Sequence, residues 1–326
     1  MSSKACRGPV RSLVLCFLAI FSLGASGAHA QTYPAKTIEW ISHTSAGSGT
    51  DLWNRNVSVI LEKEKILNVP FIHTNRVGGN GLIAYQYLKN KKGDPYIVMA
   101  MAVSVILSLS ILPDTGLALD SVTPIIRMAQ DPQVVAVRTE SKFRTYKELI
   151  TAARDGNVVA GITGPTGSGR MALYYIERDT GAKFKYVTFK GGGDAVLATL
   201  GGHVEVTTEN LSEMLPLVEA GKMRLLAVTG ERRFKQAPDV PTLKELGYKT
   251  VVATGRGFGM APGVPKEAAA TMEQALKRVY DSQAYKDYAD RNMFEDAYLN
   301  SADFAKALVA QRADQLEFLK AVGIVK

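Results

Sequence analysis

Three glycine-rich segments with serine or threonine hydroxyls mark the places where this chain can do chemistry. They are residues 43–51 (HTSAGSGTD), 163–170 (TGPTGSGR) and 190–194 (KGGGD). Each joins an apolar run typical of a strand to a run with helical spacing. The first amides of a helix lack partners within the helix, and the helix dipole favours negative charge there. Because glycine and serine let an oxyanion approach the backbone closely, these segments predict carboxylate binding without a required cationic side chain.

Each segment also has a structural interpretation. Residues 48–51 fit an S-x-x-D capping box, and we favour a role for Asp51 in capping its own helix over ligand contact. For residues 45–48, ligand contact and plain turn geometry fit the sequence equally well. Thr166 or Ser168 can cap the second helix. In the third segment the glycines can serve tight packing, with Lys190 on the surface, but the recurrence of three such segments favours binding.

The runs around these segments predict an α/β fold with a mostly parallel sheet. In the first part of the chain we expect strands at residues 37–43, 69–74 and 96–102, and helices at residues 51–67 and 81–89. In open α/β sheets, ligands bind beyond the carboxyl ends of the strands. The glycine-rich segments lie at those ends.

A second group of elements predicts a second lobe. We expect helices at residues 145–154 and 170–179, the latter stopped by Gly181, and strands at residues 158–162, 186–189 and 203–207. Residues 125–138, interrupted by Asp131-Pro132, are interpreted as the first crossing between lobes, residues 224–229 as the return, and residues 257–261 as a candidate for the last crossing. Residues 266–323 should be mainly helical and wrap the first lobe. These assignments divide the chain into residues 31–131 with 229–326 (lobe 1) and 132–228 (lobe 2).

The first thirty residues have the features of a secretory signal peptide. Lys4, Arg7 and Arg11 precede an apolar run at residues 12–23, and Ala28-His29-Ala30 follows as a cleavage site. The run is too short for a membrane anchor, which needs roughly 20 apolar residues. We therefore expect residues 1–30 to be removed and the mature chain to be periplasmic.

Composition excludes several classes of function. Cys6 and Cys16 are the only cysteines and both lie in the signal peptide, so the mature chain has no disulfide, thiolate metal site or cysteine nucleophile. The formal charge is +8, but the basic residues are scattered and form no stripe. This pattern argues against nucleic-acid binding and favours weak attraction of anions.

Enzyme and cofactor motifs fail on inspection. Residues 164–171 resemble a Walker A loop, but Arg170 replaces the phosphate-binding lysine and Met171 replaces the hydroxyl that holds magnesium. Residues 79–84 fit only a short, weak dinucleotide pattern. The mature chain has no G-x-S-x-G or H-E-x-x-H motif. We expect no catalytic residue, cofactor or metal, and we interpret the three histidines as packed strand residues: His43, His73 and His203.

A series of short motifs resembles the periplasmic receptors of the tripartite tricarboxylate transporter family, also called Bug-type receptors. HTSAGSGTD stands where that family has PF-x-AGG-x-x-D. Residues 74–81 (TNRVGGNG) are close to E-N-R-x-G-A-x-G. Residues 189–192 (FKGG), 201–206 (GGHVEV) and 238–242 (PDVPT) follow in the family's order. The resemblance runs from Tyr33 almost to the C-terminus.

The resemblance implies a two-lobed periplasmic-binding-protein fold, type II-like, that closes on a small organic carboxylate and delivers it to a membrane permease. It implies a monomer that binds no nucleic acid. Mapped residue by residue, the ligand-binding positions are Ser45, Ala46, Gly47, Ser48, Thr163, Gly164, Thr166, Gly167, Ser168, Glu209 and Asn210. For Glu209 and Asn210 the alternative role is capping of the helix that begins at Leu211.

Some positions depart from the family pattern. His43-Thr44 replaces Pro-Phe, Ser48 replaces glycine, and residues 255–258 (GRGF) replace a Trp-Gly segment. Arg256 can pair with a second ligand carboxylate or lie on the surface. These departures change the wall of the expected binding site, where the part of the ligand distal to its anchoring carboxylate would bind.

The expected ligand is a di- or tricarboxylate or an aromatic acid. The first alternative is a sensory receptor for an organic acid that signals through a membrane sensor. A periplasmic hydrolase or transferase of the same fold ranks last.

Overall fold

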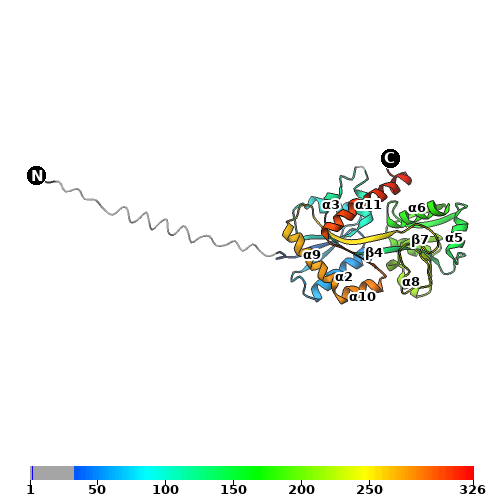
Figure 1. Ribbon diagram of the computed structural model, residues 1–326, viewed down its shortest axis with the longest axis horizontal. Helices are drawn as coiled ribbons and strands as arrows, with labels where there is room; N and C mark the ends of the chain where they lie inside the picture. The colour runs from blue at the N-terminus through cyan, green and yellow to red at the C-terminus, as the bar shows by residue number, and fades with distance from the viewer. Residues whose placement is uncertain (1, 3–32, 113) are drawn as a thin grey trace.

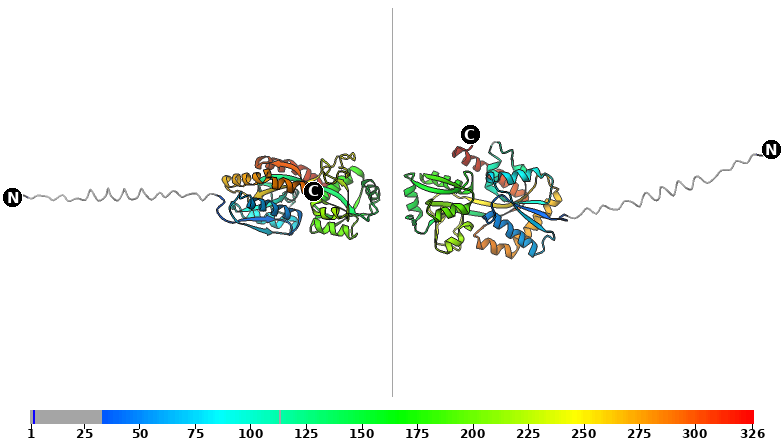
Figure 2. Two further views of the ribbon diagram at one scale, coloured as in Figure 1. Left: turned by 90° about the horizontal axis from the view of Figure 1, so that it is seen from below. Right: turned by 180° about the vertical axis from the view of Figure 1, so that it is seen from behind.

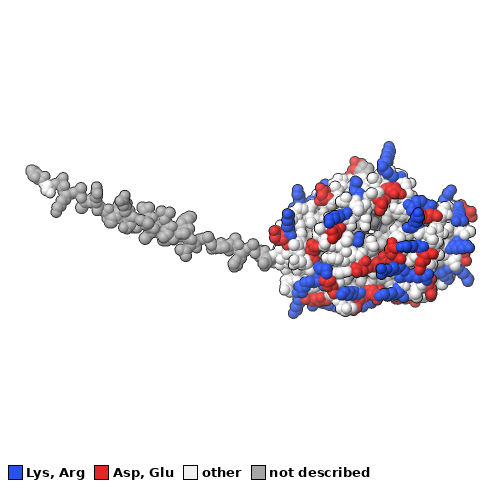
Figure 3. Space-filling view, viewed as in Figure 1, with Lys and Arg blue, Asp and Glu red and all other residues white. Residues whose placement is uncertain are grey.

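The computed structural model describes residue 2, residues 33–112 and residues 114–326 (Figure 1). Apart from residue 2, the predicted signal peptide lies outside the described residues, and so do both cysteines. Within the described part, no helix has both the length and the apolar character that a membrane crossing requires. Acidic and basic side chains are interspersed over the face seen in Figure 3.

The first part of the chain forms alternating strands and helices, as predicted. The elements are β1 (Ile38–Ser42), α2 (Gly49–Lys63), β2 (Phe71–Asn75), α3 (Leu82–Asn90) and β3 (Ile97–Ala102). β1 pairs in parallel with both β2 and β3. Every residue of β3 is buried, because this strand lies between β1 and β9 (Ala253–Met260) and is covered on both faces.

One long strand, β4 (Thr123–Arg138), belongs to both halves of the molecule (Figure 1). Its first half pairs with β9 and with β10 (Glu295–Leu299). Its second half pairs with β7 (Val206–Asn210) and β8 (Met223–Val228). The strand continues through Asp131 and Pro132, where the sequence suggested an interruption, because both residues pair with β9.

The second half contains β5 (Val158–Thr163) and β6 (Phe184–Phe189), which pair in parallel, and β7 pairs with β5. Its helices are α5 (Tyr146–Ala153), α6 (Ser168–Thr180), α7 (Gly192–Leu200) and the short α8 (Leu215–Glu219). Gly181 ends α6 in the left-handed conformation, with a φ of 72°, as predicted.

Three sequence expectations need correction. β7 begins at Val206 rather than at residue 203, so Glu209 and Asn210 belong to the strand itself. The expected return crossing at residues 224–229 is instead β8, which pairs with the second half of β4. β10 interrupts the C-terminal region that was expected to be mainly helical. The lobe boundaries given above stay a proposal, with β9 as the strand that returns to β3.

The C-terminal helices cover the first half of the molecule. They are α9 (Lys266–Asp281), α10 (Gln283–Arg291) and α11 (Ser301–Ala321). α9 packs on α2 and β4, and α11 packs on β4 and on α4 (Val103–Leu109). In Figure 2 these orange and red helices lie beside the blue N-terminal elements. The core between them includes Trp53 and Phe258, whose rings stack with centroids 4.4 Å apart.

Candidate functional site

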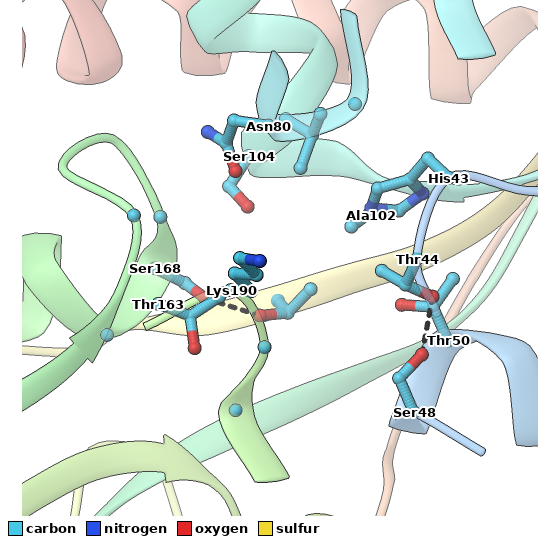
Figure 4. A pocket seen from close by; sticks show the side chains of 18 of the residues that line it. His43, Thr44, Ser48, Thr50, Asn80, Ala102, Ser104, Thr163, Ser168 and Lys190 are labelled. Atoms are coloured by element: carbon cyan, nitrogen blue, oxygen red, sulfur yellow. Dashed lines mark hydrogen bonds between the residues drawn. The ribbon is translucent and has the colours of Figure 1, made fainter. Parts of the chain in front are cut away.

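A cavity of about 460 Å³ lies between the two halves, beyond the carboxyl ends of β1, β3, β5, β6 and β7 (Figure 4). Its lining combines residues from both halves, including all three glycine-rich segments. A second cavity, of about 470 Å³, is lined largely by charged and polar residues near α10 and β10 and contains none of the predicted site residues. The first cavity is therefore the candidate site.

Five α-helices begin at the cavity, and none has a side-chain cap. Their N-cap residues are Ser48 for α2, Gly81 for α3, Ala102 for α4, Gly167 for α6 and Gly191 for α7, and all five line the cavity. No N-cap side chain satisfies the first-turn amides of these helices, which makes these ends suitable for an anion. The first amides of α3 bond to the carbonyls of Gly78 and Gly79, and the Gly49 amide of α2 bonds to Glu213.

The first segment is held in place by Asp51. This carboxylate accepts hydrogen bonds from the Gly47 amide, from Arg55 and from Asn75, at 2.8 to 2.9 Å. Burial alone would raise the pKa of Asp51, but these bonds outweigh it and lower the pKa. The predicted capping box is wrong in detail, because Asp51 bonds to Gly47 and the Ser48 hydroxyl donates to Thr44 instead. Asp51 does not line the cavity, so its role is structural.

The structure brings eight of the eleven predicted positions to the cavity. The lining includes Ser45, Ser48, Thr163, Gly164, Gly167, Ser168, Glu209 and Asn210. It does not include Ala46 or Gly47, which form the turn fixed by Asp51. Thr166 is also absent from the lining: its side chain is buried and accepts a hydrogen bond from Asn80, and its carbonyl accepts one from Ser108.

The second segment makes direct contacts with the first half of the molecule. Neither Thr166 nor Ser168 caps α6, contrary to the structural interpretation of that loop. The Ser168 hydroxyl instead lies 2.7 Å from the Thr254 hydroxyl on β9. Asn80 donates to Thr166 across the same gap. The two sides of the cavity are thus already in contact in this conformation.

Some glycines are required by packing. A side chain at Gly169 would overlap the carbonyl of Thr208 on β7, and one at Gly192 would overlap the carboxylate of Glu213. Without side chains, α6 can begin directly against β7 and α7 directly against Glu213. For these two glycines the packing interpretation holds.

Asn210 does not cap the short helix that begins at Leu211, because its amide donates to the carbonyl of Asp131 at 2.9 Å. Glu209, only 6 % exposed, accepts a 2.8 Å hydrogen bond from the Thr163 hydroxyl. Both residues lie at the end of β7 and face the cavity as strand residues. The alternative capping role is therefore wrong for both.

Several residues that line the cavity were not among the predicted ligand-binding positions. Lys190 lines the cavity (Figure 4), although a surface position was also open to it. Ser104, Glu213 and Thr254 carry no motif that marks them. Their positions depend on the tertiary fold. Asn80, in the glycine-rich turn at residues 78–81, and Lys190, in residues 189–192, lie in segments that resemble the family motifs.

Arg256 is neither on the surface nor free. It is 2 % exposed, and its Nε donates to Asp131 at 2.9 Å while Nη1 donates to Thr50 at 3.0 Å. The guanidinium of Arg256 is therefore paired with Asp131 and is not free to pair with a second ligand carboxylate. Arg256 lines the cavity beside the start of α2.

Burial shifts the titration of three groups that line the cavity. It lowers the pKa of His43 to about 4, helped by the nearby charge of Arg256, so this imidazole is neutral near pH 7. Burial also raises the pKa of both Glu209 and Glu213, and the repulsion from Glu213 adds to the effect on Glu209. The lining offers backbone amides, hydroxyls and Lys190 for binding an anion.

The chain matches known proteins over most of its length. Residues 56–324 match the model of the tripartite tricarboxylate transporter family receptor. A Cupriavidus necator protein, "UPF0065 protein in gbd 5′ region", is 27 % identical over 97 % of each chain. A TctC solute-binding protein from Polaromonas is 29 % identical with a TM-score of 0.68, over 89 % of this chain and all of the other.

The fold also matches an R. palustris protein with adipate, which is 22 % identical, with a TM-score of 0.83 over 89 % of this chain and 98 % of that one. The α/β fold expected from the sequence, of the periplasmic-binding-protein type, is thereby confirmed. Together with the family match over residues 56–324, the conclusion is plain: this chain belongs to the receptor family of the tripartite tricarboxylate transporters.

Proposed function

We propose that this chain is a periplasmic receptor that binds a small organic carboxylate in the cavity and delivers it to a tripartite tricarboxylate-type permease. The observation that carries the proposal is the meeting of five helix starts without side-chain caps at one cavity. The adipate held by the R. palustris protein supports a carboxylate as the ligand class. Binding and release, not turnover, is the function of this site.

Closure about β4 and β9 would follow from contacts on both sides of the cavity. A ligand stabilises the closed conformation only by the difference between its affinities for the closed and open conformations. An anion held by α2 on one side and by α6 and α7 on the other meets that condition. Hinge closure of this kind is a common response of two-lobed binding proteins.

Isothermal titration calorimetry on the purified mature protein tests the proposal. The panel contains adipate, malate, citrate and benzoate, with glucose as an uncharged control. We expect at least one acid to bind and to be recovered chemically unchanged. Binding of glucose with no binding of any acid would contradict the proposal, and conversion of a bound acid would favour the hydrolase or transferase alternative.

A further inference from the structure

The cavity holds two buried carboxylates at the place where a ligand carboxylate would bind. Glu209 faces the cavity from the end of β7, and its Oε1 accepts a hydrogen bond from the Thr163 hydroxyl. Glu213 lies beside the starts of α2 and α7, and its Oε2 is buried without a partner. Two acidic side chains of the protein thus lie at the same helix starts where we propose that the ligand anion binds.

Most of the positive charges near these carboxylates are engaged by other groups. Arg256 is paired with Asp131 in a buried ion pair, and its charge only partly offsets the effect of burial on Glu213. Arg170, in the first turn of α6, pairs with Glu177 and stacks on Tyr186. Asp194 lies exposed in the first turn of α7. His43 is neutral near pH 7 because its pKa is low. Of the cationic side chains that line the cavity, this leaves Lys190 without a partner of its own among the described residues.

Resting on the proposed function, we propose that Glu209 is a specificity-determining residue that binds the ligand as a neutral acid. Its proton is shared with a ligand carboxylate, so the complex carries one more proton than the free protein and the free anion. The bond formed is an O–H···O hydrogen bond from Glu209 to the ligand, and the proton comes from solvent. Charge-assisted bonds between oxygens of this kind are short and strong.

The raised pKa of the buried pair supports this assignment, because the proton is held at a higher pH than an ordinary carboxyl allows. The two groups titrate together, so the pair as a whole takes up the proton. Below the pKa of the free pair the proton is already present and binding takes up none. Above it, each bound anion brings one proton, and the apparent Kd rises about tenfold per pH unit.

Calorimetry with adipate and malate, repeated in buffers of different ionisation enthalpy, counts the protons taken up. We expect uptake close to one proton per anion at about pH 9 and little uptake at about pH 5, on either side of the raised pKa. Binding without proton uptake at any pH would overturn this inference and leave the proposed function intact. Failure of adipate, malate and every other acid of the panel to bind would contradict both.

Two variants test which of the two carboxyl groups carries the proton. Glu209→Gln keeps a neutral donor at the site, so we expect it to bind with wild-type affinity or better and to lose both the proton uptake and the pH dependence. Glu213→Gln removes a repelling charge, so the uptake should persist with its pH window shifted to lower pH. Proton uptake by Glu209→Gln equal to that of the wild type would overturn the assignment.

The matched control is Glu205→Gln. Glu205 precedes β7, pairs with the exposed Lys142 and accepts a hydrogen bond from the Val159 amide, outside the cavity lining. The variant should retain the proton uptake of the wild type. Circular dichroism of all three variants identifies any that misfolds, and the two cavity variants make independent predictions.

Discussion

The helices that begin at the cavity differ from those that begin elsewhere. α5, α10 and α11 start with Thr145, Ser282 and Asn300, and each of these side chains accepts a hydrogen bond from the helix it precedes. α2, α3, α4, α6 and α7 have no such cap. Side-chain caps thus occur at three helix starts away from the cavity and at none of the starts that line it.

Two further helices show that the absence of a cap alone does not define a site. α8 and α9 begin away from the cavity without a side-chain cap, but each has a proline at its start, Pro216 and Pro265. Proline has no amide hydrogen, so one fewer donor needs a partner there. What distinguishes the cavity is the convergence of several open starts that still carry their amides.

The largest expected effect concerns the buried charges at the cavity. Arg256→Met removes the partner of Asp131 and should lower the free energy of unfolding by about 3–5 kcal/mol, because an unpaired buried charge remains. Arg233→Met breaks the exposed ion pair with Glu245 and should lower the free energy of unfolding by less than about 1 kcal/mol. Chemical denaturation measures both, and equal losses would contradict the distinction between the cavity and the surface.

The acid sensitivity of the protein should also originate at the cavity. The unfolded chain protonates His43 at its ordinary pKa of 6.5, whereas the folded protein resists protonation down to about 4. Native stability should therefore fall between these pH values, by on the order of 3 kcal/mol for this group. His43→Gln should reduce that loss. His203→Gln should not, because His203 is exposed and precedes β7, contrary to the packed strand position predicted for it. The test is the free energy of unfolding of the wild type and both variants, measured from pH 7 to pH 4. The same pH dependence in all three proteins would exclude His43 as the cause of the acid sensitivity.

The smallest expected effects on stability are those of substitutions at the N-cap residues. Thr145→Ala removes the cap of α5 and should lower the free energy of unfolding by about 1 kcal/mol, without a change in ligand affinity. Ser48→Ala removes no capping bond and should change stability by less than about 0.5 kcal/mol. Thermal melts of both variants check the difference. A larger loss for Ser48→Ala would mean that this serine caps α2 after all.

Sequence reasoning located the segments but not the contacts between them. The glycine-rich turns predicted where α2, α6 and α7 begin, because glycine and hydroxyl residues after an apolar run are local signals. The exact span of β7 was missed, because the alternating run continues past residue 207 without a turn residue. Arg256 could not be placed, since its partner Asp131 is 125 positions away. The meeting of Glu209 and Glu213 with the starts of α6 and α2 likewise depends on tertiary packing.

The most direct test of the account gives an N-cap at the cavity the carboxylate that it lacks. Ser48→Asp should cap α2 with a fixed negative charge, and Ser282→Asp makes the same change at α10, away from the cavity. With the acid that binds the wild type in calorimetry, we predict that Ser48→Asp raises Kd at least about tenfold, or about 1.4 kcal/mol. Ser282→Asp should leave Kd unchanged. Equal affinity of the two variants would contradict the claim that open helix starts at the cavity hold the anion.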